Sequence, residues 1–277
     1  MMTIGIMEGR LVPPTEGRFQ SFPRERWRDE FALAATAGLE AIEWIYDLYG
    51  ADVNPIAGDD GLEQLRSLSA QTGIQVRSLC ADYFMDKPLL RADEQEIDAR
   101  AETLRWLLGQ CAMLGMNRVV LPFVDASRID SDEELGDVVA VVERVLPTVV
   151  ASGVELHLET SLTPDRFADL LARLPHSMVK VNYDSGNSSS LGYRPIDEFA
   201  AYGARVGSVH IKDRVRGGGT VPLGSGDADF ESLFKCLEDI AYRGDFVLQV
   251  ARGTDGDEVA WARQNREFVL ARQTGSA

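Results

Sequence analysis

Eight polar side chains recur along the chain, each at or near the end of a short apolar run. They are Glu8, Glu43, Asp82, Asp125, Glu159, Asp184, His210 and Gln249. Carboxylates that gather within a few ångström raise one another's pKa unless protons or a cation compensate them. If the runs end at one place, a divalent metal ion is the economical explanation for so many acidic groups.

Four of these residues form the sharpest candidate ligand set. They are Glu159 in VELHLET, Asp184 in VNYDSGN, His210 in SVHIKD and Gln249 in FVLQVAR. Two carboxylates, one imidazole and one amide oxygen suit a single Mn²⁺, Mg²⁺, Co²⁺ or Zn²⁺ ion that keeps open positions for substrate oxygens. We therefore predict one divalent metal ion as the cofactor.

Such an ion would acidify a C–H bond next to a sugar carbonyl and stabilise the resulting enediolate. Glu159 is the predicted base. A single base could return the proton to the adjacent carbon, which isomerises an aldose and a ketose. For epimerisation a second group must deliver the proton to the opposite face, and Glu43, Asp82 and Asp125 are the candidates.

A basic loop follows His210, with Lys212, Arg214 and Arg216 directly before three glycines at 217–219. Glycines let backbone N–H groups approach an oxyanion closely, so the loop could bind a phosphate or carboxylate of the substrate. A solvated charged loop is an equally good interpretation of the composition, and the position beside the metal site favours anion binding. The further substrate-binding candidates are Glu8, Asp125, Asn187 and Arg252.

The elements that must position these residues alternate regularly along the chain. Eight β-rich apolar runs are predicted as strands: Thr3–Met7, Glu40–Ile45, Gln75–Cys80, Arg118–Phe123, Val154–Glu159, Met178–Tyr183, Val206–Ile211 and Phe246–Val250. Amphipathic stretches of helical period separate them. Eight such units in 277 residues predict a (β/α)8 TIM barrel of the α/β class, as one domain over residues 1–277. In that fold the active site lies at the carboxyl ends of the strands.

Composition excludes several classes of function. The net charge of −16 would repel nucleic acids, which require a basic surface. No run of 18 apolar residues predicts a membrane span, and no basic and apolar leader precedes the first strand, so we expect a cytoplasmic protein. Cys80, Cys111 and Cys236 lie far apart without a CxxC pair, which argues against a thiolate metal site and a disulfide framework.

Several segments together resemble the xylose isomerase-like TIM-barrel superfamily, and within it the L-ribulose-5-phosphate 3-epimerase-like sugar-phosphate isomerases and epimerases. They include GIMEGRLVPP, CADYFM, LPFVD, NYDSGN, VHIKDR and VPLGSGDADF. The resemblance implies a metal bound by Glu159, Asp184, His210 and a second glutamate, with both glutamates moving the proton. Gln249 stands at that fourth position, and an amide cannot act as a general base.

The expected partner is thus a small sugar or sugar phosphate, and family resemblance alone makes a homo-oligomer possible. Two alternatives stay open, and a third is disfavoured. A sugar or inosose dehydratase would use the same enolate chemistry to expel water, and a non-catalytic sugar-binding barrel would explain the loss of a base at Gln249. An endonuclease IV-like site would require many histidines, whereas the chain has three.

Overall fold

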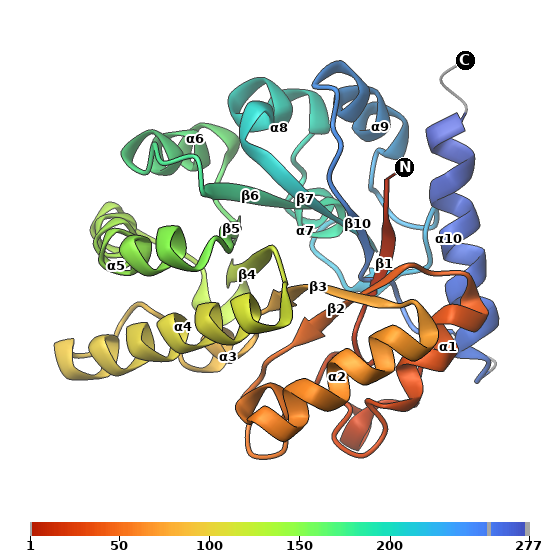
Figure 1. The fold of residues 1–277 in the computed structure, drawn as a ribbon. Coiled ribbons are helices and arrows are strands. Elements are labelled where there is room, and N and C mark those ends of the chain that lie inside the picture. Colours follow the sequence, from red (N-terminus) through yellow and green to blue (C-terminus); the bar gives the residue numbers. More distant parts are fainter. Residues whose placement is uncertain (1, 254–255, 275–277) are drawn as a thin grey trace.

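Eight parallel strands close into a barrel, and helices surround it (Figure 1). The computed structural model describes residues 2–253 and 256–274. The order around the barrel is β1-β10-β7-β6-β5-β4-β3-β2. These strands are β1 (Ile4–Met7), β2 (Ala41–Ile45), β3 (Gln75–Cys80), β4 (Arg118–Phe123), β5 (Glu155–Thr160), β6 (Val179–Asp184), β7 (Val206–Ile211) and β10 (Phe246–Leu248). The predicted (β/α)8 barrel is confirmed.

The long helices follow the strands in alternation and pack around the outside of the barrel (Figure 1). They are α1 (Asp29–Ala37), α2 (Asp59–Thr72), α4 (Glu94–Leu114), α5 (Asp132–Ser152), α6 (Pro164–Arg173), α8 (Pro195–Tyr202), α9 (Phe230–Asp239) and α10 (Glu258–Thr274). Gly38 and Gly115 end α1 and α4 with φ of 78° and 74°, a conformation that glycine adopts without strain. None of the helices in the described ranges is both long and apolar enough to cross a bilayer.

Short elements interrupt the loops that follow the strands. They are α3 (Tyr83–Asp86), α7 (Ser185–Leu191), the antiparallel pair β8 (Asp213–Arg214) and β9 (Thr220–Val221), and four 3₁₀ turns at Thr15–Gly17, Pro55–Ala57, Asp125–Ser127 and Gly203–Arg205. The sequence analysis did not predict them, because they are too short for a hydrophobic period to show. Several lie beside the carboxyl ends of the strands and shape the candidate site.

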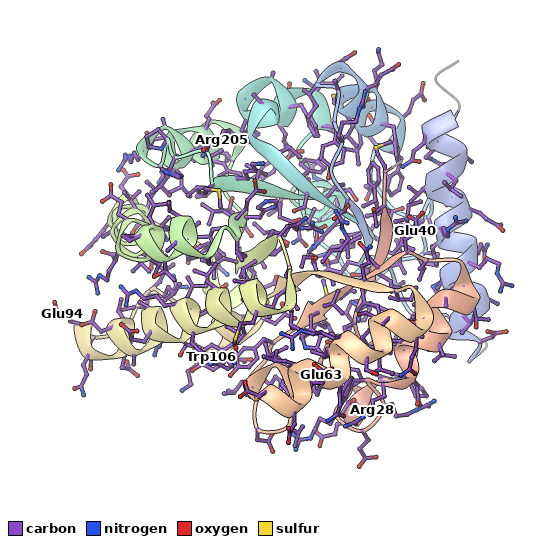
Figure 2. All side chains as sticks on the ribbon, in the orientation of Figure 1. Arg28, Glu40, Glu63, Glu94, Trp106 and Arg205 are labelled. Carbon is purple, nitrogen blue, oxygen red and sulfur yellow. The ribbon has the colours of Figure 1, made fainter. Side chains whose placement is uncertain are left out.

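The two faces of the strands differ in chemistry. Outward-facing residues such as Leu79, Leu156 and Val209 are fully buried under the helices, while the outer faces of the helices carry charged side chains such as Glu63 and Glu94 (Figure 2). The barrel interior, in contrast, is largely polar, and its side chains bond to one another across the strands. Buried polar side chains therefore extend along the barrel interior, and one cavity lies at each end of the barrel.

Candidate metal centre

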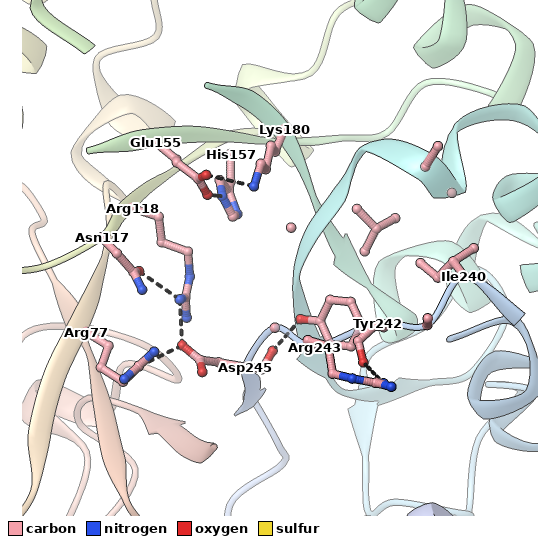
Figure 3. A pocket seen from close by; sticks show the side chains of 16 residues that line it. Arg77, Asn117, Arg118, Glu155, His157, Lys180, Ile240, Tyr242, Arg243 and Asp245 are labelled. Atoms are coloured by element: carbon pink, nitrogen blue, oxygen red, sulfur yellow. Dashed lines mark hydrogen bonds and ion pairs between the residues drawn. The ribbon is translucent and has the colours of Figure 1, made fainter. Parts of the chain in front are cut away.

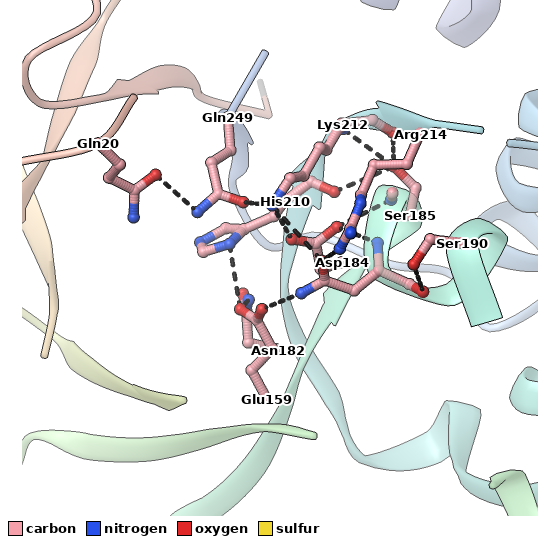
Figure 4. A network of polar contacts seen from close by, with 12 residues as sticks. Gln20, Glu159, Asn182, Asp184, Ser185, Ser190, His210, Lys212, Arg214 and Gln249 are labelled. Carbon is pink, nitrogen blue, oxygen red and sulfur yellow. Dashed lines mark hydrogen bonds and ion pairs between the residues drawn. The ribbon is translucent and has the colours of Figure 1, made fainter. Parts of the chain in front are cut away.

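Glu159, Asp184 and His210 converge at the carboxyl end of the barrel (Figure 4). They belong to β5, β6 and β7, which are neighbouring strands of the barrel, and Asp184 pairs with His210 in the register of β6 and β7. One ligand atom from each side chain lies within 4.8 Å of the others, and all three residues are buried. The structure thus brings together three of the four residues that the sequence predicts as ligands.

The contacts of the two His210 ring nitrogens indicate whether these residues fit a metal ion. Its Nδ1 is buried without a hydrogen-bond partner and lies 3.3 Å from Glu159 Oε2, while its Nε2 lies 2.6 Å from Glu43 Oε1. Burial alone would lower the His210 pKa, but the flanking carboxylates of Glu43 and Glu159 raise it to about 10. The two carboxylates therefore favour a positive charge at this point, which a proton on His210 supplies when no metal is bound, and an imidazole nitrogen with two carboxylates is a donor set that fits a divalent cation.

Neighbouring amides fix the orientation of the two carboxylates. Asp184 caps α7, and its Oδ1 accepts hydrogen bonds from the backbone N–H groups of Gly186 and Asn187, both at 2.8 Å. Glu159 accepts from the side-chain amides of Asn187 at 2.6 Å and Asn182 at 2.7 Å. Such partners hold metal-binding carboxylates in one rotamer and reduce the cost of bringing the ligands together.

Glu43 lies behind His210 and does not line the cavity described below. It is 1% exposed, accepts a hydrogen bond from Ser78 Oγ at 2.6 Å, and lies 3.8 Å from Arg118 Nη2. Burial by itself would raise the Glu43 pKa, but the charges and hydrogen bonds of its neighbours lower it to about 2. Glu43 is thus an ionised partner of the imidazole, a carboxylate–histidine pair of the kind found behind metal ligands.

A cavity of about 290 Å³ opens beside the three converging residues. Its walls include Glu159, Cys80, Asp82, Asp125, Asn187 and Lys212. Gln249 also lines it. Burial, together with the nearby charges of Asp47 and Glu159, raises the pKa of Asp82 to about 6. The hydrogen bonds from Gln20 and Cys80 lower the pKa but do not cancel this effect. Asp82 is therefore a carboxyl that can hold a proton near neutral pH.

A chain of amides connects Gln249 to Asp82. Gln249 Oε1 accepts from Lys212 Nζ at 3.0 Å, and its Nε2 donates to Gln20 Oε1 at 3.1 Å (Figure 4). Gln20 Oε1 also accepts from Arg10 at 2.8 Å, and Gln20 Nε2 donates to Asp82 at 2.6 Å. Because Arg10 and Lys212 only donate, the amides of Gln20 and Gln249 each have one possible orientation. Gln249 therefore serves as a donor toward Gln20, a role that a glutamate could not fill.

Four predicted substrate-binding residues contact other parts of the protein. Glu8 is fully buried and accepts from Ile45 N at 2.8 Å, and burial raises its pKa well above the usual value. Arg252 donates to the carbonyls of Val12 and Gly9. Arg214 donates to Gly218 O and to Asn187, and Arg216 is exposed outside the cavity.

The glycine loop is likewise occupied by its own contacts. Gly217 N donates to Ser190 O and Gly218 N donates to Val215 O, both at 2.8 Å. These two N–H groups are therefore not available to an anion. Nearby, buried Asp213 accepts from the N–H groups of Gly224, Gly226 and Ala228, which explains why HIKD and the glycine-rich turn occur together: the aspartate holds the turn in place.

The sequence analysis missed Gln20, Asp47 and Asn182. Asn182 precedes Asp184 by two residues on the same strand, so the strand period of two could have placed it on the interior face. Gln20 and Asp47 line the cavity from irregular loops after β1 and β2, where no periodic signal exists.

Known proteins match this chain over most of its length. The family model described as xylose isomerase-like TIM barrel matches residues 31–272. L-ribulose-5-phosphate 3-epimerase UlaE of Salmonella paratyphi A is 25% identical over 260 residues, which cover 90% of each chain. Among solved structures, an L-ribulose 3-epimerase has a TM-score of 0.77 at 18% identity, covering 99% of this chain and 95% of its own.

The IOLI protein, whose structure contains a zinc atom, has a TM-score of 0.77 at 17% identity, covering 98% of this chain and 99% of its own. At these identities the two solved structures show the fold alone. The resemblance inferred from the sequence segments is confirmed by the family match, which spans most of the described residues. The chain belongs to the xylose isomerase-like TIM barrel family.

Proposed function

We propose that the protein is an isomerase or epimerase that acts on a small ketose or aldose with the help of one divalent metal ion. The observation that supports this most directly is the buried His210 Nδ1, which lacks a hydrogen bond and faces Glu159 beside a polar cavity. The names of the matched relatives, which are sugar epimerases, support the same class of reaction.

The metal site would be formed by Glu159, Asp184 and His210, and a bound ion would act as a Lewis acid toward a carbonyl and an adjacent hydroxyl of the sugar. Glu159 lines the cavity and is the base that removes the proton from carbon. Lys212 Nζ and the Asn187 amide lie on the same side and can donate to sugar oxygens on which negative charge develops. Glu43 positions His210 from behind and does not touch the substrate.

Asp82 is the proposed second acid–base group, since Gln249 cannot fill that role. It lies after β3, two strands around the barrel from Glu159, and lines the same cavity. Its pKa of about 6, raised by burial, allows it to hold the proton that the opposite face of the sugar must receive. Gln20 fixes the carboxyl through the amide chain from Gln249.

The charge of the cavity favours an uncharged sugar over a sugar phosphate. Among the described residues that line it, Lys212 is the one cationic side chain, and five carboxylates face the same space: Asp47, Asp82, Asp86, Asp125 and Glu159. A phosphate dianion would meet a net negative wall even with a divalent ion in place. Arg214 and Arg216, which could have changed this balance, lie outside the cavity.

The test is solvent exchange. The Mn²⁺-loaded enzyme is incubated in D₂O with paired free and phosphorylated ketoses and aldoses, and each recovered sugar is analysed by NMR and mass spectrometry. We expect deuterium at the carbon next to the carbonyl in at least one free sugar and its product, and none with the Glu159→Gln variant. Absence of deuterium from every recovered sugar would refute the proposal, and a product lighter by one water would indicate a dehydratase.

A further inference from the structure

A second cavity, of about 420 Å³, lies at the opposite end of the barrel from the metal centre (Figure 3). Its walls come largely from the first three positions of strands β3 to β7 and from the loops that precede these strands and β10, so it lies at the amino-terminal mouth. The proposed sugar chemistry does not use this end of the molecule.

The walls of this lower cavity are cationic, although the whole chain carries a net charge of −16. Four cationic side chains, Arg77, Arg118, Lys180 and Arg243, line the space together with two carboxylates, Glu155 and Asp245. A concave surface with low-dielectric walls and an excess of one charge concentrates ions of the opposite sign. In this protein the lower cavity is thus suited to an anion.

Arg118 has an unused donor in this cavity. The residue is 3% exposed, and its Nη1 donates to Asp245 Oδ2 at 2.7 Å and to Asn117 Oδ1 at 3.0 Å. Its Nε is buried without a hydrogen-bond partner. An Nε–H group without a protein partner can donate to an anion that binds beside it.

The two carboxylates do not balance the cations. Asp245 pairs with both Arg77 at 3.0 Å and Arg118 at 2.7 Å, and Glu155 pairs with Lys180 at 2.7 Å. Arg243 donates from Nη1 to the Tyr242 carbonyl at 2.8 Å, and within the described ranges no carboxylate lies within ion-pair distance of it. Arg118 also lies 3.8 Å from Glu43, so among the described cations of this cavity Arg243 is the one without a carboxylate partner.

We propose that the lower cavity binds a small oxyanion, the phosphate or carboxylate group of a metabolite, through Arg118, Lys180 and Arg243. Charge-assisted N–H···O bonds from guanidinium and ammonium groups are the strong contacts by which proteins hold such groups. The cavity volume exceeds that of a bare phosphate, so a ligand of a few carbon atoms fits it. This inference does not depend on the proposed sugar reaction.

The experiment measures binding of inorganic phosphate and of succinate to the metal-free protein by titration calorimetry at low salt. Two single variants, Lys180→Met and Arg243→Met, change partly or fully exposed side chains and leave the buried Arg118 in place. Lys235→Met removes one exposed positive charge on α9 as a matched control. Lys212→Met tests whether the anion instead occupies the cavity at the metal centre.

We expect saturable binding of at least one anion, and affinity about tenfold weaker in the Lys180→Met and Arg243→Met variants. The Lys235→Met and Lys212→Met variants should bind as the wild type does, and binding should weaken as salt rises. The anion that binds more tightly identifies the group. The proposal is overturned if neither anion binds saturably, or if Lys212→Met abolishes binding while Lys180→Met and Arg243→Met do not weaken it.

Discussion

Replacing Glu43 by Gln tests how the barrel prepares its metal centre. Glu43 contacts His210 Nε2 at 2.6 Å from a position that is 1% exposed, so the two groups form a buried charge-assisted hydrogen bond. Glutamine has nearly the same shape. Its carbonyl can still accept from His210 and its amide can donate to Ser78 Oγ, so the substitution removes the charge and preserves the hydrogen-bond geometry.

The magnitude follows from the loss of that charge. A buried hydrogen bond to a charged group contributes about 1.5–3 kcal/mol, whereas a neutral one contributes about 0.5–1.5 kcal/mol. The difference, about 1–1.5 kcal/mol, corresponds to roughly a tenfold loss of metal affinity. The amide would also point a donor toward Arg118, which now lies 3.8 Å from the carboxylate, and this adds to the loss. We therefore expect Mn²⁺ to bind about 10–100-fold more weakly.

The assay is competition of Mn²⁺ with a chelator, with thermal unfolding to verify the fold. Ser78→Ala is the matched control, because it removes a hydrogen bond from the same carboxylate but keeps its charge, and its Mn²⁺ affinity should change less than about threefold. Wild-type affinity in a folded Glu43→Gln variant would refute the reasoning. A loss of turnover at saturating metal with unchanged affinity would instead indicate direct contact between Glu43 and the substrate.

Three further predictions concern the residues around the cavity. Glu159→Gln should lower turnover about 10²–10⁴-fold and leave the unfolding temperature nearly unchanged, and a near-normal rate would exclude Glu159 as the base. Gln249→Glu adds a negative charge beside Lys212 and removes the donor to Gln20. The added charge should tighten metal binding measured by calorimetry. An unchanged metal affinity would indicate that Gln249 does not interact with the ion. Asp82 with a pKa of about 6 supplies a proton only while protonated, so kcat/KM should fall as pH rises above about 6. The Asp82→Asn variant should have a lower rate, and its kcat/KM should no longer fall as pH rises above about 6. If that fall persists in the variant, another group causes it.

The regular part of the fold could be predicted because hydrophobic period is a local property. The strands Gln75–Cys80, Arg118–Phe123 and Val206–Ile211 have the predicted bounds. The ends of β5 and β6 differ by one residue, because a strand ends where its neighbour stops pairing and not where its apolar run stops.

Local sequence also singled out the candidate ligand residues that the structure brings together, since an acidic group or histidine at a strand end is unusual and parallel strands end at one face. Glu159, Asp184 and His210 needed only that argument. It failed to separate residues that face the cavity from residues that lie behind it. Glu8 directly follows β1 and Glu43 lies in the middle of β2, and both are buried away from the cavity, since Glu8 bonds to Ile45 N and Glu43 bonds to His210.

The chain by itself therefore determined the barrel, the end of the barrel at which the candidate ligand residues gather, and the chemical types of those residues, because these follow from hydrophobic period and residue class. Tertiary structure decided the rest. Only the folded chain brings Gln20 against both Gln249 and Asp82, directs Arg214 and Arg252 to backbone carbonyls, and groups four cations at the far mouth. Hydrogen bonds and charges act over a few ångström in space, and residues that are 229 positions apart in sequence, as Gln20 and Gln249 are, become neighbours only when the barrel closes.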